Sequence, residues 1–251
     1  MFPLPTVLAV VPCYNEAVHI GFVVREMRKY VERILVVDDG SSDGTGELAR
    51  QAGAEILRHP ATQGKGAALQ SGLRHARQLG FEWVLALDGD GQHDPADIPQ
   101  FLSASASIPL VVGNRMPQAA KIPWLRRQVN RWMSRRISRL AGCFLPDTQC
   151  GFRRIHIPSW AQVKMETRRF EIESEMLLSF VAAGYPIEFI PVEVIYRGEQ
   201  SKIRPWRDTI RWFHWWNQAQ AEFRAARSRR EESDSAAAAL RGSKSTDGLP
   251  S

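Results

Sequence analysis

The stretch Leu85-Ala-Leu-Asp-Gly-Asp-Gly-Gln-His-Asp94 changes abruptly from apolar to acidic and polar residues. The apolar run at 83–87 predicts a short buried strand, and Asp88, Asp90 and Gln92 follow at its carboxyl end. An open α/β sheet binds its ligands at this edge. Oxygen ligands at alternate positions suit Mg²⁺ or Mn²⁺, which keep coordination positions open for substrate phosphates. The stretch therefore predicts a ligand and cation site at the end of a strand.

Polar or acidic residues also follow the other predicted strands. Because the carboxyl ends of parallel strands meet at one edge, five such β-α repeats predict an α/β fold with a doubly wound, mostly parallel sheet. The strands are predicted at residues 6–11, 34–37, 54–58 and 110–112, in addition to 83–87. The segments that follow those four are Pro12-Cys-Tyr-Asn-Glu16, Asp38-Asp-Gly-Ser-Ser-Asp-Gly-Thr45, Gly64-Lys-Gly-Ala-Ala68 and Gly113-Asn-Arg115.

The composition describes a chain that can bury a core but has no membrane span. Hydrophobic residues make up 44% of the 251 residues, and no apolar run reaches the ~18 residues that a span needs. The first residues lack the basic segment of a secretory signal. Cys13, Cys143 and Cys150 are an odd number without metal-ligand spacing, which is typical of reduced thiols. We therefore expect a cytoplasmic protein.

The positive charge is concentrated in the second half. The formal net charge is +6, the isoelectric point is near 9.5, and arginine gathers in residues 115–139 and 197–230. This distribution indicates an anionic partner, which can be a phosphorylated substrate, a lipid surface or nucleic acid.

Two helices in this half are predicted to be amphipathic. The helix at 206–227 is rich in tryptophan and arginine, and its wide apolar face suits either packing on the sheet or an anionic membrane interface. From residue 228 the composition predicts a disordered tail, 228–251. The helix at 124–141 has an apolar side and an arginine side, formed by Leu125, Val129, Trp132, Met133 and Leu140 and by Arg127, Arg131 and Arg135.

Four motifs occur in a characteristic order: Pro12-x-Tyr-Asn-Glu16, Val37-Asp-Asp-Gly-Ser-x-Asp-Gly-Thr45, Gly64-Lys-Gly-Ala-Ala68 and Asp88-x-Asp-x-Gln92. This set resembles the family 2 inverting glycosyltransferases and, more narrowly, the dolichyl- or polyprenyl-phosphate mannose and glucose synthases. The resemblance implies a sheet of the nucleotide-diphospho-sugar transferase type. It also implies a glycosyltransferase domain at 1–205, with a nucleotide-sugar half at 1–115 and an acceptor half at 116–205.

The resemblance also implies the donor site. Asp88, Asp90 and Gln92 would hold Mg²⁺ or Mn²⁺, which neutralises charge on the leaving nucleoside diphosphate. The residues expected to bind the nucleotide-sugar are Pro12, Tyr14, Glu16, Val37, Asp38, Asp39, Lys65, Asp88, Gly89, Asp90, Arg115, Arg197 and Lys202.

The acceptor site is implied by later motifs. Arg131, Ser201 and Lys202 would bind the acceptor phosphate, since these positions match the family. Asp147, in Asp147-Thr-Gln-Cys-Gly-Phe-Arg153, would lie near the sugar, and with Asp88 and Asp90 it completes the predicted catalytic set.

The expected reaction is transfer of a hexose, with inversion, from UDP- or GDP-hexose to a polyprenyl or dolichyl phosphate. That acceptor is already ionised and needs no general base. A lipid or saccharide hydroxyl acceptor would need one, and Asp147 or a glutamate within 171–175 could serve.

Two other classes fit the sequence poorly. A nucleotidyltransferase normally has a glycine-rich loop with arginine after its first strand. A nucleic-acid-binding protein does not explain the carboxylates. We expect partners to be the nucleotide-sugar, the lipid phosphate and the inner membrane surface, with no nucleic acid.

Overall fold

The computed structural model of the chain describes residues 7–195 and 205–244. Within these residues, seven strands form one sheet in the order β3-β2-β1-β4-β6-β5-β7. β6 is antiparallel to both neighbours, and the other pairings are parallel. The predicted α/β class and mostly parallel sheet are confirmed. The strands are β1 (Val7–Cys13), β2 (Arg33–Asp38), β3 (Glu55–Arg58), β4 (Trp83–Ala86), β5 (Leu110–Asn114), β6 (Arg153–His156) and β7 (Ile187–Pro191).

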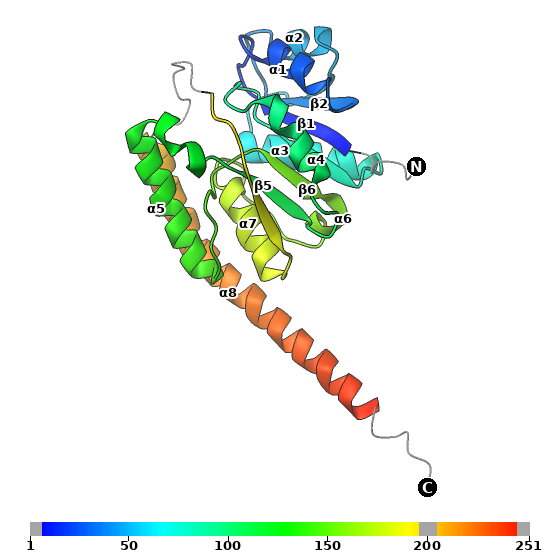
Figure 1. Cartoon of the computed structure of the whole chain (residues 1–251), viewed down its shortest axis with the longest axis vertical. Helices are drawn as coiled ribbons and strands as arrows, with labels where there is room; N and C mark the ends of the chain where they lie inside the picture. Colours follow the sequence, from blue (N-terminus) through cyan, green and yellow to red (C-terminus); the bar gives the residue numbers. More distant parts are fainter. Residues whose placement is uncertain (1–6, 196–204, 245–251) are drawn as a thin grey trace.

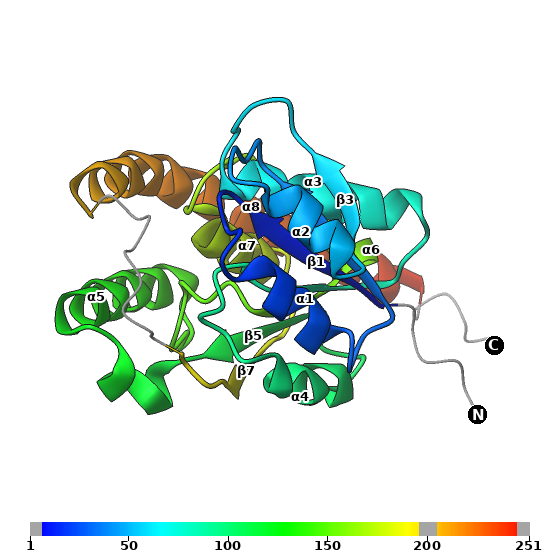
Figure 2. The ribbon, with the colours of Figure 1, turned by 90° about the horizontal axis from the view of Figure 1, so that it is seen from above.

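Helices cover both faces of the sheet. Figure 2 shows α1 and α4 on one side and α3 and α7 on the other. Close packing depends on small residues: a Cβ at Gly72 of α3 would lie 2.3 Å from Val10 Cγ1 of β1. The helices are α1 (Ile20–Met27), α2 (Thr45–Gln51), α3 (Lys65–Gln78), α4 (Ile98–Ser103), α5 (Trp124–Ala141), α6 (Ile157–Trp160), α7 (Ile172–Ala182) and α8 (Pro205–Lys244), with short 3₁₀ helices at Pro95–Asp97 and Met116–Lys121.

The tryptophans of α8 pack on the domain. Trp212 and Trp216 are buried, and their rings stack with centroids 5.1 Å apart. The ring of Trp132 in α5 lies 5.2 Å from that of Trp212. The 206–227 helix was predicted either to pack on the sheet or to meet a membrane. Trp212 and Trp216 pack on the domain.

Helix α8 extends past the boundary that the sequence predicted. It continues to Lys244, and its later part stands away from the domain (Figure 1). The disorder of 228–251 stays a prediction. The run of alanines at 236–239 has high helix propensity. An ion pair four residues apart, Arg227 Nε to Glu231 Oε1 at 3.0 Å, adds local support.

The buried side of α5 differs from the predicted apolar side. Leu125 and Val129, on the predicted apolar side, are exposed. Ser134 is buried, and its hydroxyl lies 3.1 Å from Thr148 Oγ1 in the next loop. The buried side therefore includes a polar contact that the hydrophobic pattern does not predict. The buried residues of α5 are Asn130, Met133, Ser134, Ile137 and Ala141.

No helix in the described part of the chain is both long and apolar enough to cross a membrane.

Candidate active site

The candidate site lies at the carboxyl ends of the central strands. Asp88 comes two residues after β4, and Lys65 begins α3. Lys65 Nζ is 2.8 Å from Asp88 Oδ1 and 2.9 Å from Oδ2. On its other side, Nζ is 2.6 Å from Glu173 Oε1 of α7. Pro12 and Gly151 line the same small pocket. The fold thus brings together segments that lie far apart in the sequence.

Burial and neighbouring charges shift the pKa values of Lys65, Asp88 and Asp90. Burial acts to raise the pKa of Asp88, but the charges of Lys65 and His93 hold it below its ordinary value. Burial, and then the charge of Asp88, raises the pKa of Asp90. Burial would lower the pKa of Lys65, yet Asp88 and Glu173 raise it above its ordinary value. Lys65 is therefore an ammonium, and Asp88 and Asp90 together favour additional positive charge.

The predicted cation ligands fit an oxygen-binding cation. Asp88, Asp90 and Gln92 lie in one turn, where the Gln92 main-chain N–H donates to Asp90 Oδ1 at 3.0 Å. The Asp88 and Asp90 carboxylates repel each other, so their turn favours positive charge. The Lys65 ammonium already supplies one positive charge beside Asp88. Within residues 7–195 and 205–244, no three His, Cys, Asp or Glu side chains are arranged for a metal. The proposed donor set is two carboxylates and an amide, which suits Mg²⁺ or Mn²⁺ completed by substrate oxygens.

Two glycines are required around Asp88. A Cβ at Gly151 would lie 2.5 Å from Asp88 Oδ2, and a Cβ at Gly89 would lie 2.3 Å from Cys13 Sγ. Gly89, which we expected in the donor site, thus packs against the end of β1. Burial raises the pKa of Cys13, so this thiol stays protonated.

Asp38 and Asp39 hold loops in place. Asp39 Oδ1 lies 2.6 Å from His59 Nδ1, and Asp39 Oδ2 accepts the Gly64 N–H at 2.8 Å. Asp38 Oδ1 accepts the Ser41 N–H at 2.8 Å. Both carboxylates are buried. They fix the turn after β2 and the loop that leads to α3, so the geometry gives them a positioning role. Their contact with the nucleotide-sugar stays a prediction.

The predicted donor residues in and beside the loop after β1 differ in how accessible they are. Tyr14 is exposed and accessible to a ligand. The Glu16 N–H donates to Thr45 Oγ1 at 2.8 Å, which ties this loop to the start of α2. Val37 is inaccessible within β2, and its part in binding the nucleotide-sugar stays a prediction.

Asp147 forms a buried ion pair with Arg115. Arg115 Nε and Nη2 donate to its two oxygens at 2.8 and 2.9 Å, and the Arg115 N–H adds a bond of 3.0 Å. The Gln149 N–H donates to the same carboxylate. Burial would raise the pKa of Asp147, but Arg115 brings it below its ordinary value. Asp147 is thus inaccessible and positions Arg115. Its catalytic role stays a prediction.

The acceptor side is described only in part. Arg131 is exposed on α5, as expected for a phosphate ligand or a solvated residue. Arg197, Ser201 and Lys202 lie outside the described residues. The chain approaches that segment beside the acidic motif, because the Ile195 N–H donates to the Gln92 carbonyl at 3.0 Å.

The structure distinguishes the glutamates that the sequence left open. Glu175 accepts the N–H groups of Glu166 and Thr167 at 2.8 and 3.0 Å, so it holds a loop. Glu173 faces the site and pairs with Lys65. Sequence reasoning missed this role, because three acidic residues in one helical turn give no sign of which one faces inward.

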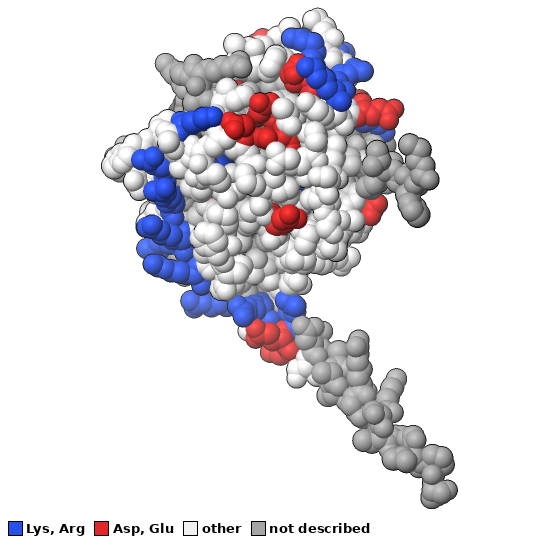
Figure 3. Space-filling model, in the orientation of Figure 1, with Lys and Arg blue, Asp and Glu red and all other residues white. Residues whose placement is uncertain are grey.

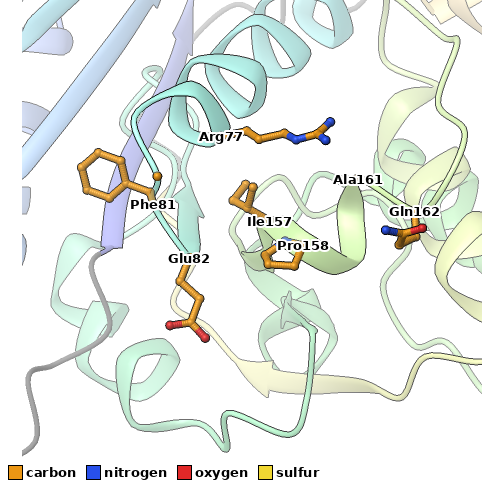
Figure 4. A pocket seen from close by; sticks show the side chains of 8 residues that line it. Arg77, Phe81, Glu82, Ile157, Pro158, Ala161 and Gln162 are labelled. Atoms are coloured by element: carbon orange, nitrogen blue, oxygen red, sulfur yellow. The ribbon is translucent and has the colours of Figure 1, made fainter.

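A larger hollow lies at the opposite end of the sheet. It has a volume of about 450 Å³ and is lined by the start of β4, the end of α3 and α6 (Figure 4). The labelled side chains include Arg77, Phe81 and Glu82. Because ligands of such folds bind at the carboxyl ends of the strands, we place the active site at Asp88.

Comparison with known proteins identifies the family. The model described as glycosyl transferase family 2 matches residues 8–156. An undecaprenyl-phosphate mannosyltransferase of Micrococcus luteus is 28% identical over 204 residues, covering 76% of this chain and 84% of that protein. The glycosyltransferase AglJ of Haloferax volcanii is 30% identical over 213 residues, covering 82% of this chain and 69% of that protein.

A solved structure has the same fold. Glucosyl-3-phosphoglycerate synthase of M. tuberculosis, in complex with Mg²⁺ and UDP, superposes with a TM-score of 0.61 at 20% identity, over 78% of this chain and 73% of that one. The similarity confirms the nucleotide-diphospho-sugar transferase type of sheet. Because the family model spans more than half of the sequence and both relatives match most of it, the chain belongs to glycosyl transferase family 2 and is a glycosyltransferase.

Proposed function

We propose that this glycosyltransferase moves a hexose, with inversion, from UDP- or GDP-hexose to a polyprenyl or dolichyl phosphate, with Mg²⁺ or Mn²⁺. The observation that carries the proposal is the pair of half-buried carboxylates after β4, with Lys65 2.8 Å from Asp88. The name of the M. luteus relative, an undecaprenyl-phosphate mannosyltransferase, supports the lipid phosphate.

In this proposal Asp88, Asp90 and Gln92 hold the cation. The bound cation would supply positive charge that stabilises the leaving nucleoside diphosphate. Lys65 and Arg115 add positive charge near it. Pro12 and Tyr14 line the donor side, and Glu16 keeps their loop in place. On the acceptor side we propose Arg131, together with the segment that carries Arg197, Ser201 and Lys202.

The positions of the acidic groups favour an acceptor that needs no base. Asp147 is inaccessible and bonded to Arg115. Glu173 is bonded to Lys65. A hydroxyl acceptor would need a carboxylate free to take its proton, whereas a phosphate is already ionised. The alternative, a lipid or saccharide hydroxyl, is therefore the second candidate.

The start of α5 is the surface that we propose meets the membrane. Trp124 and Leu125 expose 65% and 62% of their surfaces. Arg131 and Arg135 are exposed on the same helix, and Figure 3 shows basic side chains in a line along it. Apolar side chains beside arginines suit the surface of an anionic bilayer, here the inner face of the cytoplasmic membrane.

Replacing both apolar residues, Trp124→Ser with Leu125→Ser, is expected to lower binding to phosphatidylglycerol vesicles about tenfold, since their transfer into the interface is lost. Vesicle sedimentation measures this. The matched control is Leu48→Ser with Leu79→Ser, which removes two exposed leucines elsewhere. Equal sedimentation of both double variants would contradict a membrane role for α5.

The function itself is tested by nucleoside diphosphate release. Purified protein is incubated with UDP- and GDP-hexoses and Mn²⁺ or Mg²⁺, with and without undecaprenyl phosphate in detergent. We expect release from one donor only when both lipid and cation are present. Lipid-independent binding without release would favour the hydroxyl-acceptor alternative.

A further inference from the structure

One half-buried lysine lies between two carboxylates in the candidate site. Lys65 Nζ is 2.8 Å from Asp88 Oδ1 and 2.6 Å from Glu173 Oε1. The Glu173 side chain is only 5% accessible. Its second oxygen, Oε2, is buried and has no hydrogen-bond donor among the described residues. A single ammonium thus serves two acidic groups, and only Asp88 belongs to the proposed cation site.

The first turn of α7 is built to hold Lys65 independently of Asp88. The Glu173 carbonyl accepts a hydrogen bond from Arg153 Nη1 at 2.8 Å, which fixes this turn against the start of β6. The ring of Phe170 lies 5.9 Å from Lys65 Nζ and adds a cation–π contact. Glu173 Oε2 is free to accept a second hydrogen bond from the same ammonium.

We propose that Glu173 is a positioning residue that holds Lys65 when a divalent cation binds Asp88. The inference rests on the proposed function, because it concerns the cation of that site. A divalent cation and an ammonium repel each other in a buried environment, so they cannot both contact Asp88 closely. Lys65 then shifts to Glu173 and remains at the edge of the site, where it meets the anionic donor.

This arrangement predicts coupling between three charges. In Glu173→Gln, Lys65 has no second carboxylate to move to when Mn²⁺ binds Asp88. Mn²⁺ binding is therefore expected to weaken about tenfold. In Lys65→Met, nothing competes for Asp88, and Mn²⁺ binding is expected to strengthen severalfold. In the double variant, the effect of Glu173→Gln is expected to disappear, because the lysine that needed it is gone.

The experiment is a titration with Mn²⁺ alone, in which electron paramagnetic resonance measures the free ion. Glu166→Gln is the matched control, since it removes an exposed lysine partner: Lys164 Nζ lies 2.6 Å from Glu166 Oε1. We expect the control to bind Mn²⁺ like the wild type. Circular dichroism and thermal melting establish that each variant is folded. If Lys65→Met is not folded, Lys65→Gln replaces it in the cycle.

The outcomes separate this inference from the proposed function. Suppose that the wild type binds Mn²⁺ and that Glu173→Gln weakens Mn²⁺ binding equally in the wild-type and Lys65→Met backgrounds. The positioning role is then refuted, while the cation site stands. If neither Mn²⁺ nor Mg²⁺ binds the wild type, with or without UDP, the metal-dependent function fails first. A tenfold effect that vanishes without Lys65 supports the inference.

Discussion

Asp90→Asn is expected to lower kcat by about a thousandfold, because the amide cannot supply the negative charge that a divalent cation requires. The substitution keeps the shape of the side chain, and the amide oxygen can still accept the Gln92 N–H, as Asp90 Oδ1 does at 3.0 Å. The loss is measured by nucleoside diphosphate release at saturating donor and Mn²⁺. Rates close to wild type would refute the cation assignment.

The same variant should not be destabilised. Burial and the charge of Asp88 raise the folded-state pKa of Asp90, so its ionised form is disfavoured in the fold. A raised pKa contributes stability only below the unfolded-state value, and this contribution is lost as the pH rises through the folded-state value. At neutral pH, Asp90→Asn is therefore expected to melt at or above the wild-type temperature. The control is Asp94→Asn, which can still accept the Ala96 N–H and should retain activity.

Asp147→Ala is expected to lower the free energy of unfolding by about 3–5 kcal/mol, because it removes an inaccessible carboxylate that accepts hydrogen bonds from the partly buried Arg115. The carboxylate accepts two bonds from the guanidinium, at 2.8 and 2.9 Å, and is itself inaccessible. Urea unfolding at neutral pH measures the loss. A variant as stable as the wild type would show that this pair does not stabilise the fold.

The pH dependence and a double variant sharpen this prediction. Arg115 lowers the folded-state pKa of Asp147 against the effect of burial, so its stabilisation is complete above about pH 4 and is lost as the pH falls through the folded-state value. Replacing both partners, Arg115→Met with Asp147→Leu, should restore much of the stability because no charge is left unpaired. Activity should stay low, since Arg115 is proposed to meet the donor.

The fold could be predicted because the sequence signals that specify it are local. Apolar runs at 6–11 and 83–87 give strands that the structure has at Val7–Cys13 and Trp83–Ala86. Polar residues directly after a strand must gather at one edge of a parallel sheet, so Asp88 and Lys65 could be expected at the same site.

The side-chain partners could not be predicted, because they depend on tertiary contacts. Asp39 looks like a ligand residue in sequence, but His59 and the loop before α3 use its oxygens. Asp147 looks catalytic until Arg115 is seen beside it. The periodicity of α5 places Leu125 on its apolar side, yet Leu125 is exposed, while the polar Ser134 is buried beside Thr148.

The most direct test of the account compares two acceptors that differ in one group. The protein, Mn²⁺ and the donor found by nucleoside diphosphate release are incubated with undecaprenyl phosphate or with undecaprenol, and labelled sugar is measured in the lipid phase. We predict transfer to the phosphate at a rate at least about a hundredfold above that to the alcohol, since Asp147 and Glu173 are bonded to Arg115 and Lys65 and are not available to take a proton from a hydroxyl. Equal transfer to the alcohol would contradict the account and would require a catalytic base.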